Sequence, residues 1–330
     1  MKTRVSLLGA AAVLLAMTGT EVAAQQTLAQ VKERGALNCQ VGLPTPGFYA
    51  LAADGTWSGI DVDICRAVSA AIFDDPNKVR YQSVTSAVRF TSLANGESDL
   101  LSRTTTWTAV RDTQLGLDFV GVNFYDGQGF LVPASLGVSS ATELDGAQVC
   151  VQPGTVNEQN LVDYFEANDL SFRPVVIENL VELEQAFYAG RCDVYLSDAS
   201  TLSASRAARA PNPDDFVILP ERITKSPLGP WVRQDDPNFI AIARWTLNAL
   251  VTAEELEITQ DNIDEKRGDS HAETRRLLGT ETGLGAAFEL DDEWAYRAIK
   301  AVGNYAEIWE RNLGENTPLK LQREQNLLWN

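Results

Sequence analysis

Short hydroxyl side chains and arginines gather in one stretch of the chain, SRTTTWTAVRD, residues 102–112. The hydroxyls of Thr104 and Thr106 can donate or accept hydrogen bonds, and Arg111 follows Thr106 by five residues. A planar guanidinium binds a carboxylate through two parallel hydrogen bonds, and free N–H groups at a helix start add further donors. The stretch therefore predicts a site for a small anion or zwitterion. One alternative stays open, in which Arg111 pairs with Asp112 at the surface.

A carboxylate stands at the matching place in a later segment, CDVYLSDAS, residues 192–200. Asp198 follows an apolar run there and could hold an ammonium group, the opposite end of a zwitterion from the one that Arg111 would bind. The alternative is that Asp198 caps the helix predicted over ASTLSASRAARA, residues 199–210.

The turn QPGTVNEQ, residues 152–159, is the third candidate. Thr155 and Glu158 lie three residues apart and have the form of a capping box, which would use both side chains at a helix start. The turn could also bind the ligand. The capping box and ligand binding are compatible if the ligand contacts the backbone of the turn.

Strand and helix patterns alternate around these segments, and the alternation occurs twice. Alternation of this kind predicts parallel sheets covered by helices on both faces. Two lobes of similar design follow, with one ligand site between the carboxyl ends of their strands. The first series is 36–43, 59–73, 79–84, 86–96 and 98–102, and the second is 147–154, 157–168, 172–178, 181–190 and 192–200.

The expected crossover from the first lobe to the second is FYDGQGFLV, residues 124–132, in which Gly127 and Gly129 would permit unusual backbone angles. TKSPLGPWV, residues 224–232, is the expected return strand. We therefore expect these units: 1–24 signal peptide, 25–126 lobe one, 127–225 lobe two, and 226–330 the return to lobe one with a helical C-terminal tail packed on it.

The first residues have the pattern of a secretory signal peptide. Lys2 and Arg4 precede an apolar run over 5–17, and the small residues Val22-Ala23-Ala24 offer a cleavage site. The run is too short to span a bilayer comfortably, and we expect no later membrane span. These features predict export, most simply to a bacterial periplasm.

Charge and cysteine content exclude several classes of protein. The net charge of −18 makes nucleic acid and anionic lipid surfaces poor partners. The chain has four cysteines and a single histidine, His271, so we expect disulfides and neither a metal site nor a cofactor. Three pairings are possible. We favour Cys39–Cys65 and Cys150–Cys192, because each pair then lies within one predicted lobe.

The chain resembles the family-3 solute-binding proteins of polar amino-acid ABC transporters, particularly the general L-amino-acid and glutamate/glutamine/aspartate/asparagine binders. The resemblance implies a two-lobed α/β fold of the type II periplasmic binding proteins. It also implies a free L-amino-acid ligand, an inner-membrane permease as partner, and a monomer. The stretches that carry it are WSGIDVDICRA, TSAVRFTSL, LLSRTTTWTAVRDTQLGLDF, YDGQGF, VQPGT and GRCDVYLSDAS.

Residue roles also follow from the resemblance. Arg111 would bind the α-carboxylate, assisted by Thr106 and the backbone of the Thr155 turn, while Thr104, Thr106 and Asp198 would face the α-ammonium. The distal side-chain group of the ligand would meet two residues of TSAVR, Ser86 and Arg89. Arg89 could instead be solvated on a helix face.

The chain also departs from the acid-binding members. A histidine of some members is replaced near Leu180, and the loop over 42–55 lacks a second arginine, which favours recognition of amides as well as acids. The main rival is an enzyme on the same scaffold, which needs a positioned general acid or base. No histidine falls in a predicted cleft segment.

Overall fold

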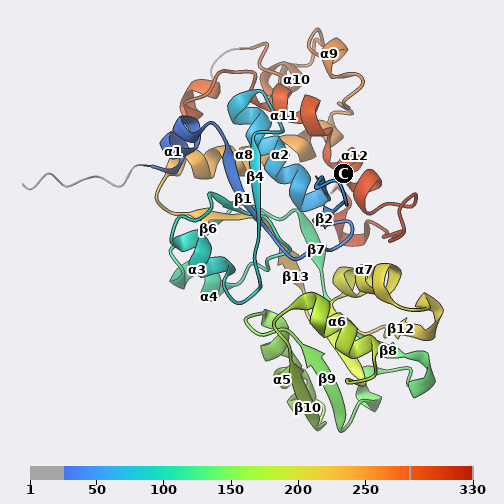
Figure 1. Ribbon diagram of the computed structural model, residues 1–330. Helices are drawn as coiled ribbons and strands as arrows, with labels where there is room; N and C mark the ends of the chain where they lie inside the picture. The colour runs from blue at the N-terminus through green and yellow to red at the C-terminus, as the bar shows by residue number, and fades with distance from the viewer. Residues whose placement is uncertain (1–25, 282–283, 329–330) are drawn as a thin grey trace, which may run out of the picture.

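The computed structural model describes residues 26–281 and 284–328, and the expected signal peptide lies outside these ranges. Two lobes, each built on a five-stranded sheet with helices against it, lie one above the other (Figure 1). This is the two-lobed α/β architecture predicted from the sequence. Within the described ranges, no helix combines the length and apolar character needed to cross a membrane.

The sheet of the first lobe has the strand order β4-β1-β5-β14-β6. β1 is parallel to β4 and β5, whereas β14 is antiparallel to β5 and β6 because the chain enters it from the second lobe. The strands are β1 (Leu37–Val41), β4 (Val79–Ser83), β5 (Leu100–Leu101), β6 (Leu117–Phe119) and β14 (Trp231–Arg233), beside a small hairpin of β2 (Ala50–Leu51) and β3 (Trp57–Ser58). The helices are α1 (Thr27–Arg34), α2 (Ile60–Phe73), α3 (Arg89–Ala94), α4 (Ala109–Gln114) and α8 (Pro237–Glu255).

The sheet of the second lobe has the order β10-β9-β11-β8-β12. β9 is parallel to β10 and β11, and the incoming strand β8 is antiparallel to β11 and β12. The strands are β8 (Gln128–Pro133), β9 (Ala147–Val151), β10 (Phe172–Val176), β11 (Val194–Asp198) and β12 (Phe216–Ile218). The helices are α5 (Val156–Ala167), α6 (Leu180–Tyr188) and α7 (Ala199–Arg209), with single turns η1 (Ala134–Leu136), η2 (Ala141–Glu143) and η3 (Pro213–Asp215).

A two-stranded ribbon joins the lobes. β7 (Phe124–Asp126) pairs antiparallel with β13 (Ser226–Leu228), and the pair lies between the two sheets in Figure 1. Gly127 follows β7, and neither Gly127 nor Gly129 has a positive φ, so the unusual backbone angles that these glycines would permit are not used. The reason for Gly127 is space, since a Cβ would lie 2.8 Å from the carbonyl oxygen of Thr224.

The C-terminal tail packs on the first lobe. Apolar side chains of α11 and α12 join the same core cluster as those of α2 and α8. Arg311 of α12 pairs with Asp63 of α2 at 2.9 Å, which ties the tail to a helix of the first lobe. The tail comprises α9 (Ile263–Lys266), α10 (Ala272–Leu277), η4 (Gly285–Phe288), α11 (Trp294–Val302), α12 (Tyr305–Asn312) and η5 (Glu324–Asn326).

Both expected disulfides are present, one in each lobe. Cys39 of β1 is bonded to Cys65 of α2, with their Cα atoms 6.4 Å apart. Cys150 of β9 is bonded to Cys192, which precedes β11, with Cα atoms 5.7 Å apart. Each bridge therefore ties a central strand to another segment of its own lobe and leaves the relative motion of the lobes free. The exact lobe boundaries given above remain predictions.

Candidate functional site

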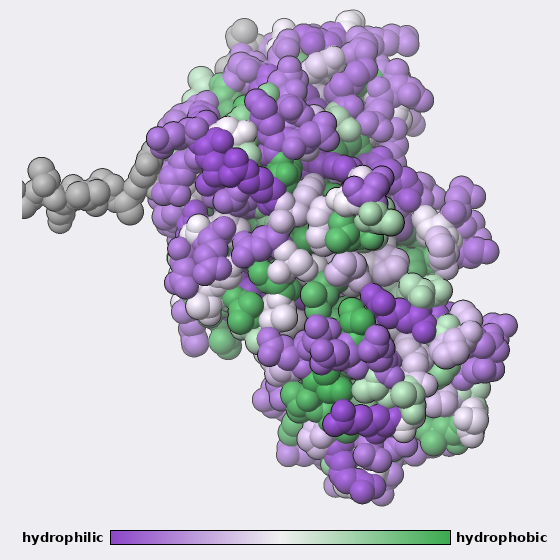
Figure 2. Space-filling view, in the orientation of Figure 1, coloured by the Kyte–Doolittle hydropathy of each residue, from purple (hydrophilic) through white to green (hydrophobic). Residues whose placement is uncertain are grey.

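A small cavity of about 40 Å³ lies between the lobes. All seven residues predicted to bind ligand line it: Ser86, Arg89, Thr104, Thr106, Arg111, Thr155 and Asp198. Sequence reasoning missed eight further lining residues: Tyr49, Arg103, Gln152, Val156, Asn157, Leu180, Ser197 and Thr201. The lobes touch along their facing edges on the side shown in Figure 2, so the cavity is that of a closed molecule.

Arg111 reaches the cavity from the first turn of α4. Its backbone N–H bonds to Thr108, the residue that caps the helix. Its side chain folds back, so that Nη1 donates to the carbonyl oxygen of Thr106 at 2.8 Å. Only 9% of the residue is exposed, so Arg111 is not a surface partner of Asp112. Burial lowers the pKa of Arg111 to about 10, while nearby Asp198 opposes the shift. A buried cation of this kind favours an anionic ligand group.

Asp198 ends β11 and stands at the first position before α7, but its carboxylate makes no capping bond. The capping alternative is therefore wrong. Its Oδ1 is buried and lacks a hydrogen-bond partner among the described residues. Burial, followed by the neighbouring charge of Asp126, raises the pKa of Asp198 to about 8. A buried carboxylate without a partner is costly unless a ligand group supplies one.

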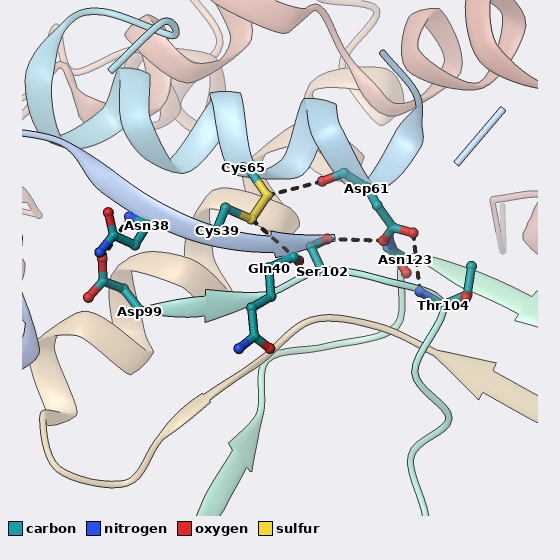
Figure 3. Close-up of a disulfide and its surroundings, with 9 residues drawn as sticks. All are labelled: Asn38, Cys39, Gln40, Asp61, Cys65, Asp99, Ser102, Thr104 and Asn123. Carbon is teal, nitrogen blue, oxygen red and sulfur yellow. Dashed lines mark hydrogen bonds between the residues drawn. A yellow bond between two sulfur atoms is a disulfide. The ribbon is translucent and has the colours of Figure 1, made fainter. Parts of the chain in front are cut away.

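Thr104 lies in a turn that the buried carboxylate of Asp61 organises (Figure 3). Asp61 Oδ1 accepts from Ser102 Oγ and Asn123 Nδ2, each at 3.0 Å, and Oδ2 accepts from the Thr104 N–H at 3.2 Å. Thr104 has φ +42°, a strained conformation for a β-branched residue. Burial raises the pKa of Asp61 to about 6, and its three hydrogen bonds oppose the shift. Asp61 thus positions a cavity residue without lining the cavity itself.

Thr155 does not form the capping box that its spacing with Glu158 allowed. It precedes α5 but makes no capping bond, and its Oγ1 instead donates to the carbonyl oxygen of Gln152 at 2.8 Å. The adjacent Gly154 has φ +71° and lies so close to the first lobe that a Cβ would be 3.1 Å from Ala87 Cα. The turn of the second lobe therefore packs directly on the first.

Three arginines converge on the cavity, of which one was not predicted. Arg89 is only 3% exposed, so the alternative of a solvated Arg89 on a helix face is wrong. Arg103 lies in the stretch SRTTTWT, and its Nη1 and Nη2 are each 3.4 Å from Ser86 Oγ. Arg103 directly precedes Thr104, and only the folded structure shows that it lines the cavity. The cavity thus contains an arginine beyond the two that were expected.

Comparisons with known proteins agree with this geometry. The general L-amino acid-binding periplasmic protein AapJ of Rhizobium johnstonii is 49% identical over 332 residues, covering 100% of this chain and 97% of the relative. The glutamate/glutamine/aspartate/asparagine-binding protein BztA of Rhodobacter capsulatus is 51% identical over 318 residues, covering 96% and 94%. A periplasmic binding protein from Brucella ovis with glutathione bound superposes with a TM-score of 0.89 at 48% identity, covering 92% of this chain and 96% of that one.

The family description "Bacterial extracellular solute-binding proteins, family 3" matches residues 38–262, which include both sheets, the joining ribbon and every residue of the cavity. The chain belongs to the bacterial extracellular solute-binding proteins, family 3.

Proposed function

We propose that this protein is a periplasmic binding protein that captures L-amino acids and delivers them to an ABC importer. The observation that carries the proposal is the pairing of a buried guanidinium, Arg111, with the buried carboxylate of Asp198, whose Oδ1 lacks a hydrogen-bond partner among the described residues, across one small cavity. These two charges match the α-carboxylate and the α-ammonium that every free amino acid carries.

The proposed ligand lies between the lobes. Its α-carboxylate binds Arg111, Thr106 and the backbone of the turn at Thr155, and its α-ammonium binds Asp198 with Thr104 and Thr106. The ligand side chain points toward Ser86 and Arg89. Glutamate, glutamine, aspartate and asparagine fit this arrangement, and a broader set remains compatible with it.

Transport follows from closure of the two lobes. We propose that the units 25–126 and 127–225 move about the ribbon of β7 and β13, and that the closed form docks on permease subunits of the inner membrane as a monomer. The names of the Rhizobium johnstonii and Brucella ovis proteins support a periplasmic location, and the sequence pattern over 1–24 supports export. Closure over the ligand would expel water and strengthen each polar contact.

Glutathione is a second candidate ligand, because the Brucella ovis protein binds it. The γ-glutamyl residue of glutathione keeps a free α-carboxylate and α-ammonium, so the same two anchors would hold it.

We favour a carrier over an enzyme on the same scaffold. Asp198 is the only carboxylic acid among the described residues that line the cavity, and it is the group needed to hold the ammonium. The relatives named above are all binding proteins, which supports the same choice.

The proposal is tested by calorimetric titration. The purified protein is unfolded to remove any bound ligand, refolded, and titrated with each proteinogenic L-amino acid and with glutathione. At least one amino acid should bind at micromolar affinity or better, and Arg111→Ala should lose about 3–5 kcal/mol of binding free energy for every ligand because a buried charge is left unpaired. Absence of binding by any amino acid to folded wild-type protein would contradict the proposal.

A further inference from the structure

We propose that Arg103 recognises the ligand side chain, and that Arg89 is a positioning residue that holds the two lobes together. The inference rests on the proposed amino-acid site. It gives different roles to the two arginines at the end of the cavity that would receive the ligand side chain. It changes the expectation from the sequence, which assigned that end to Arg89 with Ser86 and gave Arg103 no role.

The terminal nitrogens of Arg89 already donate to backbone carbonyls on both lobes. Nη1 donates to the carbonyl oxygen of Ser86 in the first lobe, and Nη2 donates to that of Gly154 in the second at 3.2 Å. The guanidinium carbon lies 4.5 Å from the centre of the Phe90 ring, which fixes its plane. Opening of the lobes would break the bond to Gly154, so Arg89 contributes to closure whichever ligand is bound.

Neighbouring contacts support this role for Arg89. Thr85 Oγ1 donates to Glu178 Oε1 of the second lobe at 2.7 Å. The backbone at Ala87 lies close against Gly154, since a Cβ on Gly154 would be only 3.1 Å from Ala87 Cα. The segment that leads into α3 is therefore an inter-lobe contact over several consecutive residues, and Arg89 is its charged member.

The guanidinium of Arg103 makes only weak hydrogen bonds with its N–H donors. Nη1 and Nη2 both point at the single oxygen Ser86 Oγ, at 3.4 Å, beyond the usual length of a strong hydrogen bond. Its Nε is buried without a partner among the described residues. One hydroxyl oxygen cannot satisfy a fork that fits the two oxygens of a carboxylate. A ligand side chain that ends in a carboxylate would match it.

The charge of the cavity indicates the same ligand class. Arg89, Arg103 and Arg111 line it with a single carboxylate, Asp198, while Asp61 lies behind the Thr104 turn. The α-carboxylate and α-ammonium of a bound amino acid cancel each other. A negative side chain is then needed to offset the remaining positive charge, so glutamate or aspartate should bind more tightly than the corresponding amides.

The test compares Arg103→Gln with the matched variant Arg89→Gln. Wild type and both variants are titrated with glutamate, glutamine and alanine after removal of bound ligand. Arg103→Gln should lower the ratio of glutamate to glutamine affinity by roughly tenfold to a hundredfold, the range for hydrogen bonds to a charged group. Arg89→Gln should weaken all three ligands by a similar factor. Small-angle X-ray scattering with saturating glutamate should show a larger radius of gyration for Arg89→Gln than for Arg103→Gln.

The opposite pattern would overturn the inference: an altered ratio in Arg89→Gln with an unchanged ratio in Arg103→Gln. A wild-type protein that binds glutamine more tightly than glutamate would overturn it as well. Arg103→Lys keeps the positive charge and serves as a second variant if Arg103→Gln does not fold. It should lower the ratio of glutamate to glutamine affinity by a smaller factor than Arg103→Gln. An unchanged ratio in folded Arg103→Lys would also count against the role of Arg103. If the wild-type protein binds no amino acid, the proposed function itself fails. The wild-type titration shows this before any variant is compared, so the two failures can be told apart.

Discussion

At the scale of single residues, the candidate site depends on buried charged groups whose hydrogen-bonding atoms are only partly paired within the protein. Thr104, Thr106, Arg111, Thr155 and Asp198 could be found because their types and their positions after strands indicate chemistry directly. Ser86 and Arg89 were assigned only through the resemblance to the family. Arg103 could not be found in this way, because only the folded structure shows that it lines the cavity beside Ser86. Tyr49 was missed for a related reason, since its hydroxyl meets Thr104 Oγ1 at 3.1 Å only after the chain has folded.

The protonation of Asp198 gives a prediction at this scale. Burial raises its pKa to about 8, so the carboxyl is largely protonated at about pH 7. A bound ammonium stabilises the carboxylate and lowers this pKa, so binding should release a proton below about pH 8. Affinity should then rise with pH, by up to roughly tenfold per unit, and level off above about pH 8. Calorimetry at about pH 7 in buffers of different ionisation enthalpy measures the number of protons that binding releases.

Asp198→Asn is the control, and it should bind more weakly with a smaller proton release. Proton uptake on binding by the wild type, or an affinity that falls between about pH 6 and pH 8, would contradict the assigned role of Asp198.

At the scale of elements, the alternation of strands and helices was predictable, whereas the local details were not. The pattern predicted parallel sheets, and β1, β4, β5, β9, β10 and β11 pair in that way. The antiparallel strands β8 and β14 arise because each enters its sheet from the joining ribbon, which is a property of topology. Thr155 and Asp198 both precede helices and resemble caps in sequence, yet both side chains are directed elsewhere.

The turn held by Asp61 gives the prediction at this scale. In Asp61→Asn, the amide N–H₂ would face the Thr104 N–H, and the turn would lose its acceptor. We expect ligand affinity to fall roughly tenfold, since an unsatisfied buried donor costs about 1–3 kcal/mol. Burial raises the pKa of Asp61 to about 6, so the ionised side chain costs folding free energy above that pH, and the amide removes this cost. The melting temperature at about pH 7.5 should therefore change little.

Asp63→Asn is the matched control for this variant. Asp63 lies on the same helix but accepts from Arg311 and Asn312 of the tail, so its variant should keep wild-type affinity. Equal losses of affinity in the two variants would mean that α2 as a whole, and not the Thr104 turn, supports binding.

At the scale of the whole molecule, the function depends on two rigid lobes that meet over a ligand. The disulfides, one within each lobe, could be predicted once two lobes had been inferred. The inter-lobe contacts could not be predicted, because Arg89 and Gly154 are 65 residues apart and meet only in the closed form. The tail packs its apolar helices on α2 and α8, which enlarges the first lobe and leaves the second free to move.

The central claim is that Arg111 and Asp198 hold the two charged groups common to all amino acids. The measurement that tests it most directly is a titration of refolded wild-type protein with L-glutamate, with glutarate, which lacks the α-ammonium, and with 4-aminobutanoate, which lacks the α-carboxylate. At about pH 9, where Asp198 is ionised, each analogue leaves one buried charge of the cavity unpaired, at a cost of about 3–5 kcal/mol. Both should therefore bind at least roughly a hundredfold more weakly than glutamate. Binding of either analogue within a few-fold of glutamate would contradict the account.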